Sequence, residues 1–222
     1  MNGASSLQAV THAQHLIAVI GIAVCWGAFG LAWIVGALYN ASRGPRRSTR
    51  ASLRPFALVG VIGSAILLAI FRLVPADGWH ALGVDSPWAT GIGLVVLIAA
   101  TAFTLWARFA LGTMWSWDPE VKMGHVLRTD GPYDITRHPI YTGILGMLLG
   151  SLLLAGVGPW LLILAAGFVF LEIKIHVEEE LMLATFPAEY RRYRERVPQL
   201  IPGLRSGRRG GERAPRTPQV RP

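Results

Sequence analysis

The residues of this chain that are best suited to chemistry lie in two polar clusters at the ends of a long apolar segment. Residues 131–143 place Arg137, His138 and two tyrosines directly before that segment. At its far end the chain continues through Lys174 and the carboxylates of residues 178–180. Polar side chains are costly to fix at a membrane surface, so they usually serve a ligand. The two clusters therefore predict a single site on one face of a membrane.

The spacing of these residues leaves two glutamates open for the central role. Glu178 follows Lys174 by one helical turn, so both side chains can face the same pocket. The apolar periodicity that follows instead places Glu179 on the inner face. His138 and Pro139 also fit an ordinary helix start, because proline at the first helical position lacks an N–H that is not needed there. Neither cluster is decisive alone, and the combination carries the prediction.

The composition indicates an integral membrane protein. The 222 residues are 52% hydrophobic and 15% charged, with a mean hydropathy of +0.43, whereas soluble domains carry about 25% charged residues. The formal charge of +8 comes from arginines in loops and in the tail, which favours lipid headgroups over nucleic acid as the partner. Cys25 is the single cysteine, so an internal disulfide and a cysteine-based zinc cage are excluded. No HExxH, Walker or GxGxxG pattern is present, and no metal is predicted.

Apolar segments divide the chain into spans and loops. A spanning helix needs about 20 apolar residues. Five segments are predicted to span the membrane: residues 15–39, 55–74, 88–111, 140–154 and 159–175. The last two are expected to form a tilted hairpin, because a Gly/Pro turn separates them. Lysine and arginine are absent from residues 1–14, 75–87 and 156–158, and they concentrate in the alternate loops. By the positive-inside rule, the N-terminus lies outside, and both polar clusters and the C-terminus lie in the cytoplasm.

A further helix is expected after the last span. Apolar and inner positions recur there at steps of three and four, which predicts an amphipathic helix against the cytoplasmic surface: Glu179, Leu183, Phe186, Tyr190, Tyr193 and Val197. The fold class predicted is thus an all-α polytopic membrane protein with about five transmembrane helices and a cytoplasmic C-terminal amphipathic helix. Its expected parts are three N-terminal spans (1–111), a core (112–203) and a disordered basic tail (204–222).

Ordered motifs in the second half of the chain resemble those of the isoprenylcysteine carboxyl methyltransferase family. They extend over residues 106–203, nearly half of the chain. The motifs are Leu111-Gly112 through Trp115, His125 to Arg128, Gly131-Pro132-Tyr133, Arg137-His138-Pro139-Ile140-Tyr141 with Gly143, then Glu178-Glu179, Leu183, Phe186, Tyr190, Tyr193, Val197 and Pro202-Gly203.

The resemblance implies an integral membrane methyltransferase that uses S-adenosylmethionine as its cofactor. Carried over by motif, the catalytic residues are Arg137, His138, Glu178 and Glu179. The cofactor-binding residues are His125, Val126, Leu127, Arg128, Tyr133, His138, Pro139, Ile140, Tyr141 and Glu178. Lys174 stands where the family often places an arginine near the substrate carboxylate, and lysine keeps the charge but loses the bidentate fork. Asp134 and Pro187 depart from the residues usual in the family.

The acceptor is expected to be a lipophilic small molecule or a prenylated group in contact with membrane lipids, with no obligate protein partner. Carboxylate O-methylation is favoured, and the alternatives are the sulfur of a small thiol and the nitrogen of a phospholipid headgroup. A carboxylate needs no general base, whereas a thiol or an amine would use His138 or His125. Two other classes stay open: a sterol-reductase-like NADPH enzyme, which shares an Arg-His…Tyr element, and a non-enzymatic scaffold or transporter. Pro139 and the glutamate pair favour methyl transfer, and the helices offer few of the mid-membrane polar residues that a transporter needs.

Overall fold

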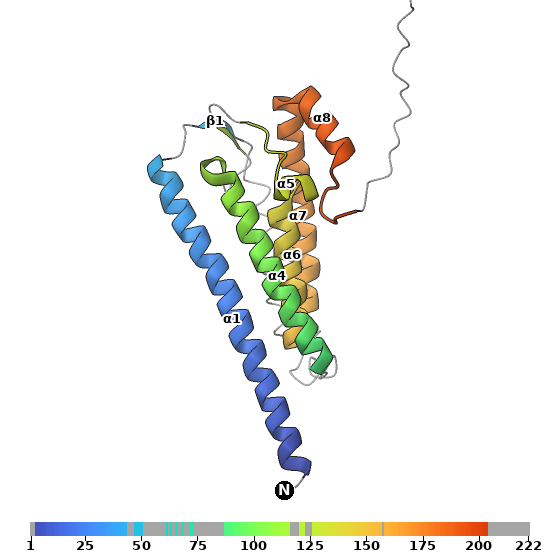
Figure 1. Ribbon diagram of the computed structural model, residues 1–222. Helices are drawn as coiled ribbons and strands as arrows, with labels where there is room; N and C mark the ends of the chain where they lie inside the picture. The colour runs from blue at the N-terminus through green and yellow to red at the C-terminus, as the bar shows by residue number, and fades with distance from the viewer. Residues whose placement is uncertain are drawn as a thin grey trace, which may run out of the picture.

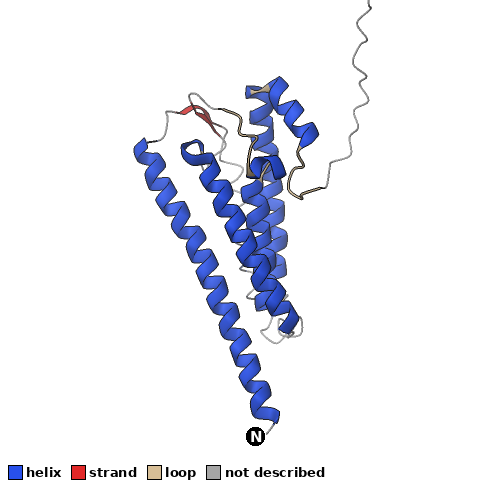
Figure 2. Cartoon of the chain, viewed as in Figure 1, coloured by secondary structure: helices blue, strands red, loops and turns tan. Residues whose placement is uncertain are grey.

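Long helices that lie side by side make up most of this computed structural model (Figure 1). It describes residues 3–43, 47–50, 61, 63, 65, 68, 72, 87–115, 120–122, 126–156 and 158–203. The long helices are α1 (Gly3–Arg43), α4 (Pro87–Leu111), α6 (Pro139–Ala155) and α7 (Gly158–Thr185). Shorter elements are η1 (Gly112–Met114), α5 (Pro132–Ile135) and α8 (Pro187–Arg196). Figure 2 shows α5 and α8 at the same end of the bundle, opposite the N-terminus.

Within the described residues, three helices are long and apolar enough to cross a membrane: His12–Asn40, Trp88–Met114 and Trp160–Thr185. They confirm apolar helices at the predicted spans 15–39, 88–111 and 159–175. Their outer faces are apolar, as at Ile20 (59% exposed) and Leu31 (63% exposed) of α1. The predicted helix 140–154 also forms, as the shorter α6. The predicted span 55–74 lies outside the described residues except for isolated positions, as do the predicted tail 204–222 and His125. The count of five spans therefore stays a prediction.

Helices α4 and α6 approach closely along a row of glycines on α6. A Cβ at Gly150 would lie 2.7 Å from the backbone nitrogen of Leu97, and one at Gly146 would lie 2.8 Å from Ala100 Cβ. At Gly143 a Cβ would collide with the Thr104 hydroxyl. Small residues allow such approaches between apolar helices, where packing rather than hydrophobic burial drives association. The glycines thus fix the start of α6 against α4.

Helix α1 packs on this pair through a small apolar core. Ala18 and Cys25 are buried against Leu97 and Met147, and the Trp26 indole on the same helix donates a 3.1 Å hydrogen bond to Ser151. Cys25 is thus a small buried side chain. The contacts tie the N-terminal helix to both α4 and α6.

The α6–α7 hairpin turns where the sequence predicts, but α7 is longer than expected. Gly156, with φ at 93°, ends α6, and α7 runs to Thr185 instead of residue 175. The second polar cluster therefore lies on the last turns of one continuous helix.

The prediction of a single amphipathic helix from Glu179 to Val197 is wrong. Helix α7 ends at Thr185 and α8 begins at Pro187, with Phe186 in a non-helical conformation between them (φ −128°, ψ 60°). Proline disfavours the helical conformation in the residue before it, which accounts for the break. Tyr190, Tyr193 and Val197 nevertheless remain buried, packed against α7.

The described residues are mainly helical, as the all-α prediction expects, and they add a short antiparallel ribbon that the sequence does not predict. Strand β1 (Arg47–Arg50) pairs with β2 (Glu120–Lys122), with Arg47 opposite Lys122 and Arg50 opposite Glu120. These polar segments lack the alternation of apolar residues that signals a strand. The ribbon joins the ends of α1 and α4 that face the site (Figure 1).

Candidate functional site

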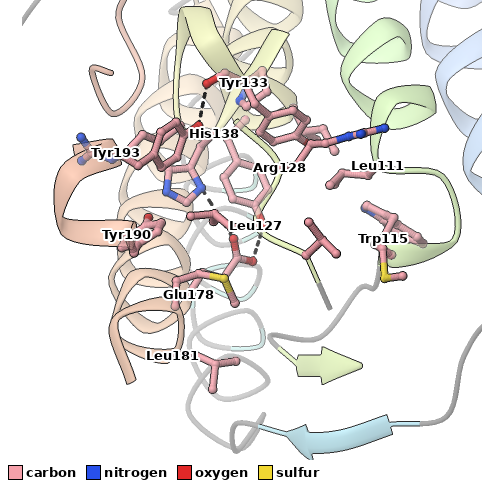
Figure 3. A pocket seen from close by; sticks show the side chains of 17 residues that line it. Leu111, Trp115, Leu127, Arg128, Tyr133, His138, Glu178, Leu181, Tyr190 and Tyr193 are labelled. Atoms are coloured by element: carbon pink, nitrogen blue, oxygen red, sulfur yellow. Dashed lines mark hydrogen bonds and ion pairs between the residues drawn. The ribbon is translucent and has the colours of Figure 1, made fainter. Parts of the chain in front are cut away.

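A pocket of about 170 Å³ lies where α4 ends, α6 begins and α7 meets α8 (Figure 3). Its lining comes from α4, η1, α5, α6, α7, α8 and the segments beside them: Leu111, Met114, Trp115, Val126, Leu127, Arg128, Tyr133, Arg137, His138, Pro139, Ile140, Tyr141, Glu178, Leu181, Met182, Tyr190 and Tyr193.

The described residues predicted to hold a cofactor all line this one pocket: Val126, Leu127, Arg128, Tyr133, His138, Pro139, Ile140, Tyr141 and Glu178. Arg137 lines it too. Glu179 and Lys174 lie next to lining residues but are not part of the lining. The structure thus brings the two polar clusters together, and their roles toward a cofactor stay a prediction.

The start of α6 aims His138 at α7. His138 is the N-cap residue and Pro139 follows at the first helical position, yet the His138 side chain makes no capping hydrogen bond. Its ring instead stacks on the Tyr141 ring, with centroids 5.7 Å apart and planes at 7°. Both rings are therefore held toward the glutamates of α7.

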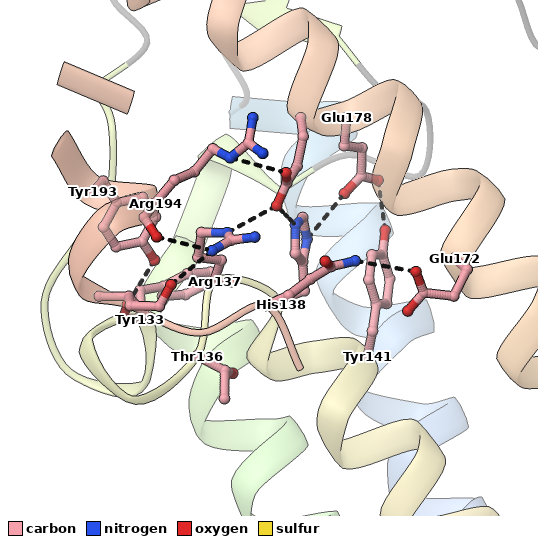
Figure 4. Close-up of polar contacts among 12 residues, drawn as sticks. Tyr133, Thr136, Arg137, His138, Tyr141, Glu172, Glu178, Tyr193 and Arg194 are labelled. Carbon is pink, nitrogen blue, oxygen red and sulfur yellow. Dashed lines mark hydrogen bonds and ion pairs between the residues drawn. The ribbon is translucent and has the colours of Figure 1, made fainter. Parts of the chain in front are cut away.

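Glu178 is the carboxylate on the pocket wall. Its Oε1 accepts a 2.5 Å hydrogen bond from the Tyr141 hydroxyl, and Lys174 Nζ lies 3.9 Å from the same oxygen. Its Oε2 lies 3.7 Å from His138 Nδ1. The group is thus fixed by neighbours (Figure 4) while it still faces the pocket.

Glu179 is instead an internal counter-charge. Its Oε1 lies 2.8 Å from Arg137 Nε and 3.3 Å from His138 Nε2, and its Oε2 lies 3.4 Å from Arg194 Nε. The side chain is 11% exposed. Removing such a carboxylate would leave the buried Arg137 guanidinium uncompensated, which costs about 3–5 kcal/mol.

Arg137 also clamps the segment after α8. Its Nη1 donates to the carbonyls of Val197 at 2.7 Å and of Arg194 at 3.3 Å. The backbone N–H groups of Arg137 and His138 donate to the carbonyls of Pro198 and Gln199 at 2.8 and 3.2 Å. This segment thus forms one side of the site, and sequence reasoning missed it because backbone carbonyls carry no residue signature.

Three tyrosines supply neutral polar surface. Tyr133, Tyr190 and Tyr193 are buried, and burial raises the pKa of each hydroxyl well above its usual value. They therefore stay protonated at neutral pH and act as donors. The Tyr193 hydroxyl donates a 2.6 Å hydrogen bond to the Tyr133 carbonyl, which joins α8 to α5.

The other side of the pocket comes from the end of α4. Leu111, Met114 and Trp115 line it. The Arg128 guanidinium donates to the Ala110 carbonyl through Nε and Nη2, at 3.0 and 2.9 Å. The segment before α5 is thus fastened to this helix end. Among the described residues, no group of three or more His, Cys, Asp or Glu side chains is arranged to hold a metal ion.

Comparison with known proteins matches this part of the chain to one family. Residues 92–184 match the model of the isoprenylcysteine carboxyl methyltransferase family. The match extends from α4 through the end of α7 and contains both polar clusters. The resemblance read from the motifs is thereby confirmed.

Individual relatives differ in the acceptor that their names give. A Bradyrhizobium diazoefficiens protein, methanethiol S-methyltransferase 2, is 30% identical over 69% of this chain and 61% of its own length. The protein-S-isoprenylcysteine O-methyltransferase of Schizosaccharomyces pombe is 37% identical over 35% of this chain and 34% of its own length. A solved eukaryotic intramembrane Ras methyltransferase, isoprenylcysteine carboxyl methyltransferase, aligns with a TM-score of 0.49 and 24% identity, over 70% of this chain and 55% of that chain. This chain thus spans less than two thirds of the length of each.

Proposed function

We propose that this chain is an integral membrane methyltransferase that uses S-adenosylmethionine and transfers its methyl group to a lipophilic or membrane-associated acceptor. The observation that supports this most directly is the position of Glu178. It is a carboxylate on the wall of a pocket at the end of apolar helices, within the residues matched by the family. The pocket also offers aromatic rings and apolar side chains, so its lining suits a cationic sulfonium joined to a nucleoside.

For methyl transfer, the protein mainly has to align the donor with the acceptor. A bound S-adenosylmethionine supplies an electrophilic methyl group, and the positive charge on its sulfur is lost as the acceptor attacks in line. The protein's task is to hold the donor and acceptor together and to exclude water. Glu178 supplies the negative charge that favours a cation, and Tyr141 and His138 hold Glu178 in place.

The ion pairs behind the pocket define positioning residues. Arg137, predicted as catalytic, directs its guanidinium to Glu179 and to backbone carbonyls. We assign Arg137 and Glu179 the role of holding His138 and the segment after α8. Lys174 Nζ lies beside Glu178 and 5.7 Å from the centroid of the Tyr141 ring. An acceptor carboxylate would therefore compete with Glu178 for Lys174.

The acceptor group has two supported candidates. Carboxylate O-methylation remains the first, in keeping with the motifs and the match to the prenylcysteine enzyme. A small thiol is the second, because the matched methanethiol enzyme aligns over a larger share of this chain. A tritiated-methyl transfer assay on membranes that contain the protein, extracted into lipid, volatile and protein fractions, separates these from a phospholipid acceptor.

Binding of the product cofactor tests the proposed function itself. We expect the purified protein to bind S-adenosylhomocysteine with micromolar affinity, about −8 kcal/mol, in isothermal titration calorimetry. NADPH, the cofactor of the sterol-reductase-like alternative, should give no heat. Tight NADPH binding together with no response to S-adenosylhomocysteine would contradict the assignment.

A further inference from the structure

One side of the pocket carries Glu178 and the tyrosines of α8, and the other offers the apolar surface of Leu111 and Trp115 beside the Arg128 guanidinium, which is bonded to the Ala110 carbonyl. Tyr190 and Tyr193 lie on one side, and Leu111 and Trp115 lie on the other (Figure 3). Glu178, the group that suits a cation, comes from α7 and not from the α4 side. If the proposed function holds, a cationic donor takes the charged side, and the apolar side is left for an apolar acceptor.

Trp115 on the apolar side is held by helix α1. The Asn40 side-chain amide donates a 2.9 Å hydrogen bond to the Trp115 carbonyl, and the Trp33 ring meets the Trp115 ring edge-on with centroids 5.8 Å apart. Asn40 and Trp33 lie seven positions apart on α1, which places them on one face of that helix. A helix outside the family match thus supports a wall of the pocket.

Arg108 completes this support from α4. Its guanidinium carbon lies 4.3 Å from the centroid of the Trp115 ring, and Nη1 donates to the Gly112 carbonyl at 3.1 Å. Arg108 is 4% exposed, and its Nε and Nη2 have no hydrogen-bond partner. Gly36 of α1 makes room for it, because a side chain there would collide with the guanidinium. A buried cation with unmet donors is costly, so the packing of α1 is needed to keep this stack together.

We infer that Trp115 is the residue that sets acceptor size, and that α1 fixes its position through Asn40, Trp33 and the Arg108 stack. The acceptor's apolar chain lies against Trp115 and Leu111, whereas the cofactor lies on the side of Glu178. This inference rests on the proposed function and adds a specificity-determining wall to it. It predicts that changes on α1 alter the choice of acceptor without altering cofactor affinity.

The test compares chain-length profiles of wild type, Trp115→Ala and Asn40→Ala. The probes are n-alkanethiols from methanethiol to octanethiol, and N-acetyl-S-farnesylcysteine as the carboxylate. We expect Trp115→Ala to shift the ratio of kcat/KM between long and short probes about tenfold toward the longer ones. This is the change in specificity that one or more methylene groups produce in an apolar pocket. Asn40→Ala should shift the ratio in the same direction by less. S-adenosylhomocysteine affinity should change less than twofold in both variants, which also shows that they fold.

The matched control is Trp88→Ala, which removes an 81% exposed tryptophan from the start of α4, at the end of that helix away from the pocket, and should leave the profile unchanged. An unchanged profile in Trp115→Ala, or a loss of S-adenosylhomocysteine affinity without a change in the profile, would overturn the inference. A wild type that binds S-adenosylhomocysteine but methylates none of these probes would also overturn it. Failure of the wild type to bind S-adenosylhomocysteine would instead refute the proposed function.

Discussion

Adjacent glutamates on α7 have different surroundings because successive helical residues point about 100° apart. Glu179 faces Arg137, His138 and Arg194, where its charge is neutralised. Glu178 lies beside Lys174 and His138 but also lines the pocket, where its carboxylate can face a ligand. The geometry therefore favours Glu178 over Glu179 as the carboxylate that contacts a ligand, and Glu178 is the residue to test.

Glu178→Gln should weaken binding of the cationic cofactor more than that of its neutral product. The substitution keeps the shape and the acceptor oxygen but removes the charge beside the sulfonium. We expect the affinity for S-adenosylmethionine to fall about tenfold, or about 1.4 kcal/mol, while that for S-adenosylhomocysteine falls much less. Calorimetry with both ligands measures the ratio. Glu180→Gln is the control, because Glu180 is 66% exposed and pairs with His176 away from the pocket. Equal losses for both ligands in Glu178→Gln would speak against a charge effect.

Sequence motifs led to the described residues around the pocket because their types and order are distinctive. Arg108 and Asn40 escaped notice for a physical reason. An arginine near a helix end and an asparagine at another are ordinary residues, and their meeting depends on how α1 packs on α4. Such contacts between distant elements leave no pattern in a single sequence.

The elements that carry the site are positioned by one close helix contact and one break. The glycine row of α6 sets its distance from α4, which in turn fixes His138 relative to the end of α4. The break at Phe186 then allows α8 to turn back over the pocket. Both features come from residues without functional groups.

Gly143→Ala should destabilise the protein by about 1–3 kcal/mol, the usual cost of overpacking. The added Cβ collides with Thr104 Oγ1 and approaches the Ala100 carbonyl at 3.0 Å, so α6 has to move. Detergent-titrated unfolding, followed by circular dichroism, gives the free energy. The same change at Gly91 of α4, where nothing lies within 4 Å of an added Cβ, should have little effect. Equal stabilities for the two variants would show that the α4–α6 seam tolerates a methyl group.

Hydrophobic periodicity predicted the existence of the helices better than their ends. The apolar runs that form α1, α4, α6 and α7 are long enough to be unambiguous. Charged residues mark the end of the apolar span at residue 175 but not the end of the helix, because α7 continues beyond the membrane boundary to Thr185. Pro187 is the sequence signal for the break at Phe186, whereas the apolar repeat across it favours one continuous helix.

At the scale of the whole molecule, the site lies at one end of the bundle and the N-terminus at the other (Figure 1). Strand β1 and helix α8, which both carry arginines, lie at the site end. We therefore propose that the pocket and the C-terminus face the cytoplasm. The division of the chain at residue 111 stays a prediction, and α4 packs closely on α6 across it.

Reporter fusions test this orientation. A reporter placed after Pro222 should be active in the cytoplasm, and one inserted at Gly83 should be exported, because residues 75–87 lack lysine and arginine. Alkaline phosphatase and green fluorescent protein provide complementary readouts. If the two reporters show the reverse pattern, the proposed topology is inverted. If both reporters lie on the same side of the membrane, the chain cannot cross it an odd number of times between Gly83 and Pro222.

The clamp between Arg137 and the segment after α8 has a consequence for how the protein is made. Arg137 Nη1 bonds to a carbonyl that lies 60 residues later in the chain. At about 5–20 residues per second, a ribosome needs roughly 3–12 s to supply that partner. During this interval α6 and α7 can enter the bilayer while the guanidinium stays hydrated at its surface. The helical hairpin of α6 and α7 can therefore form during synthesis before the segment after α8 completes the wall of the pocket.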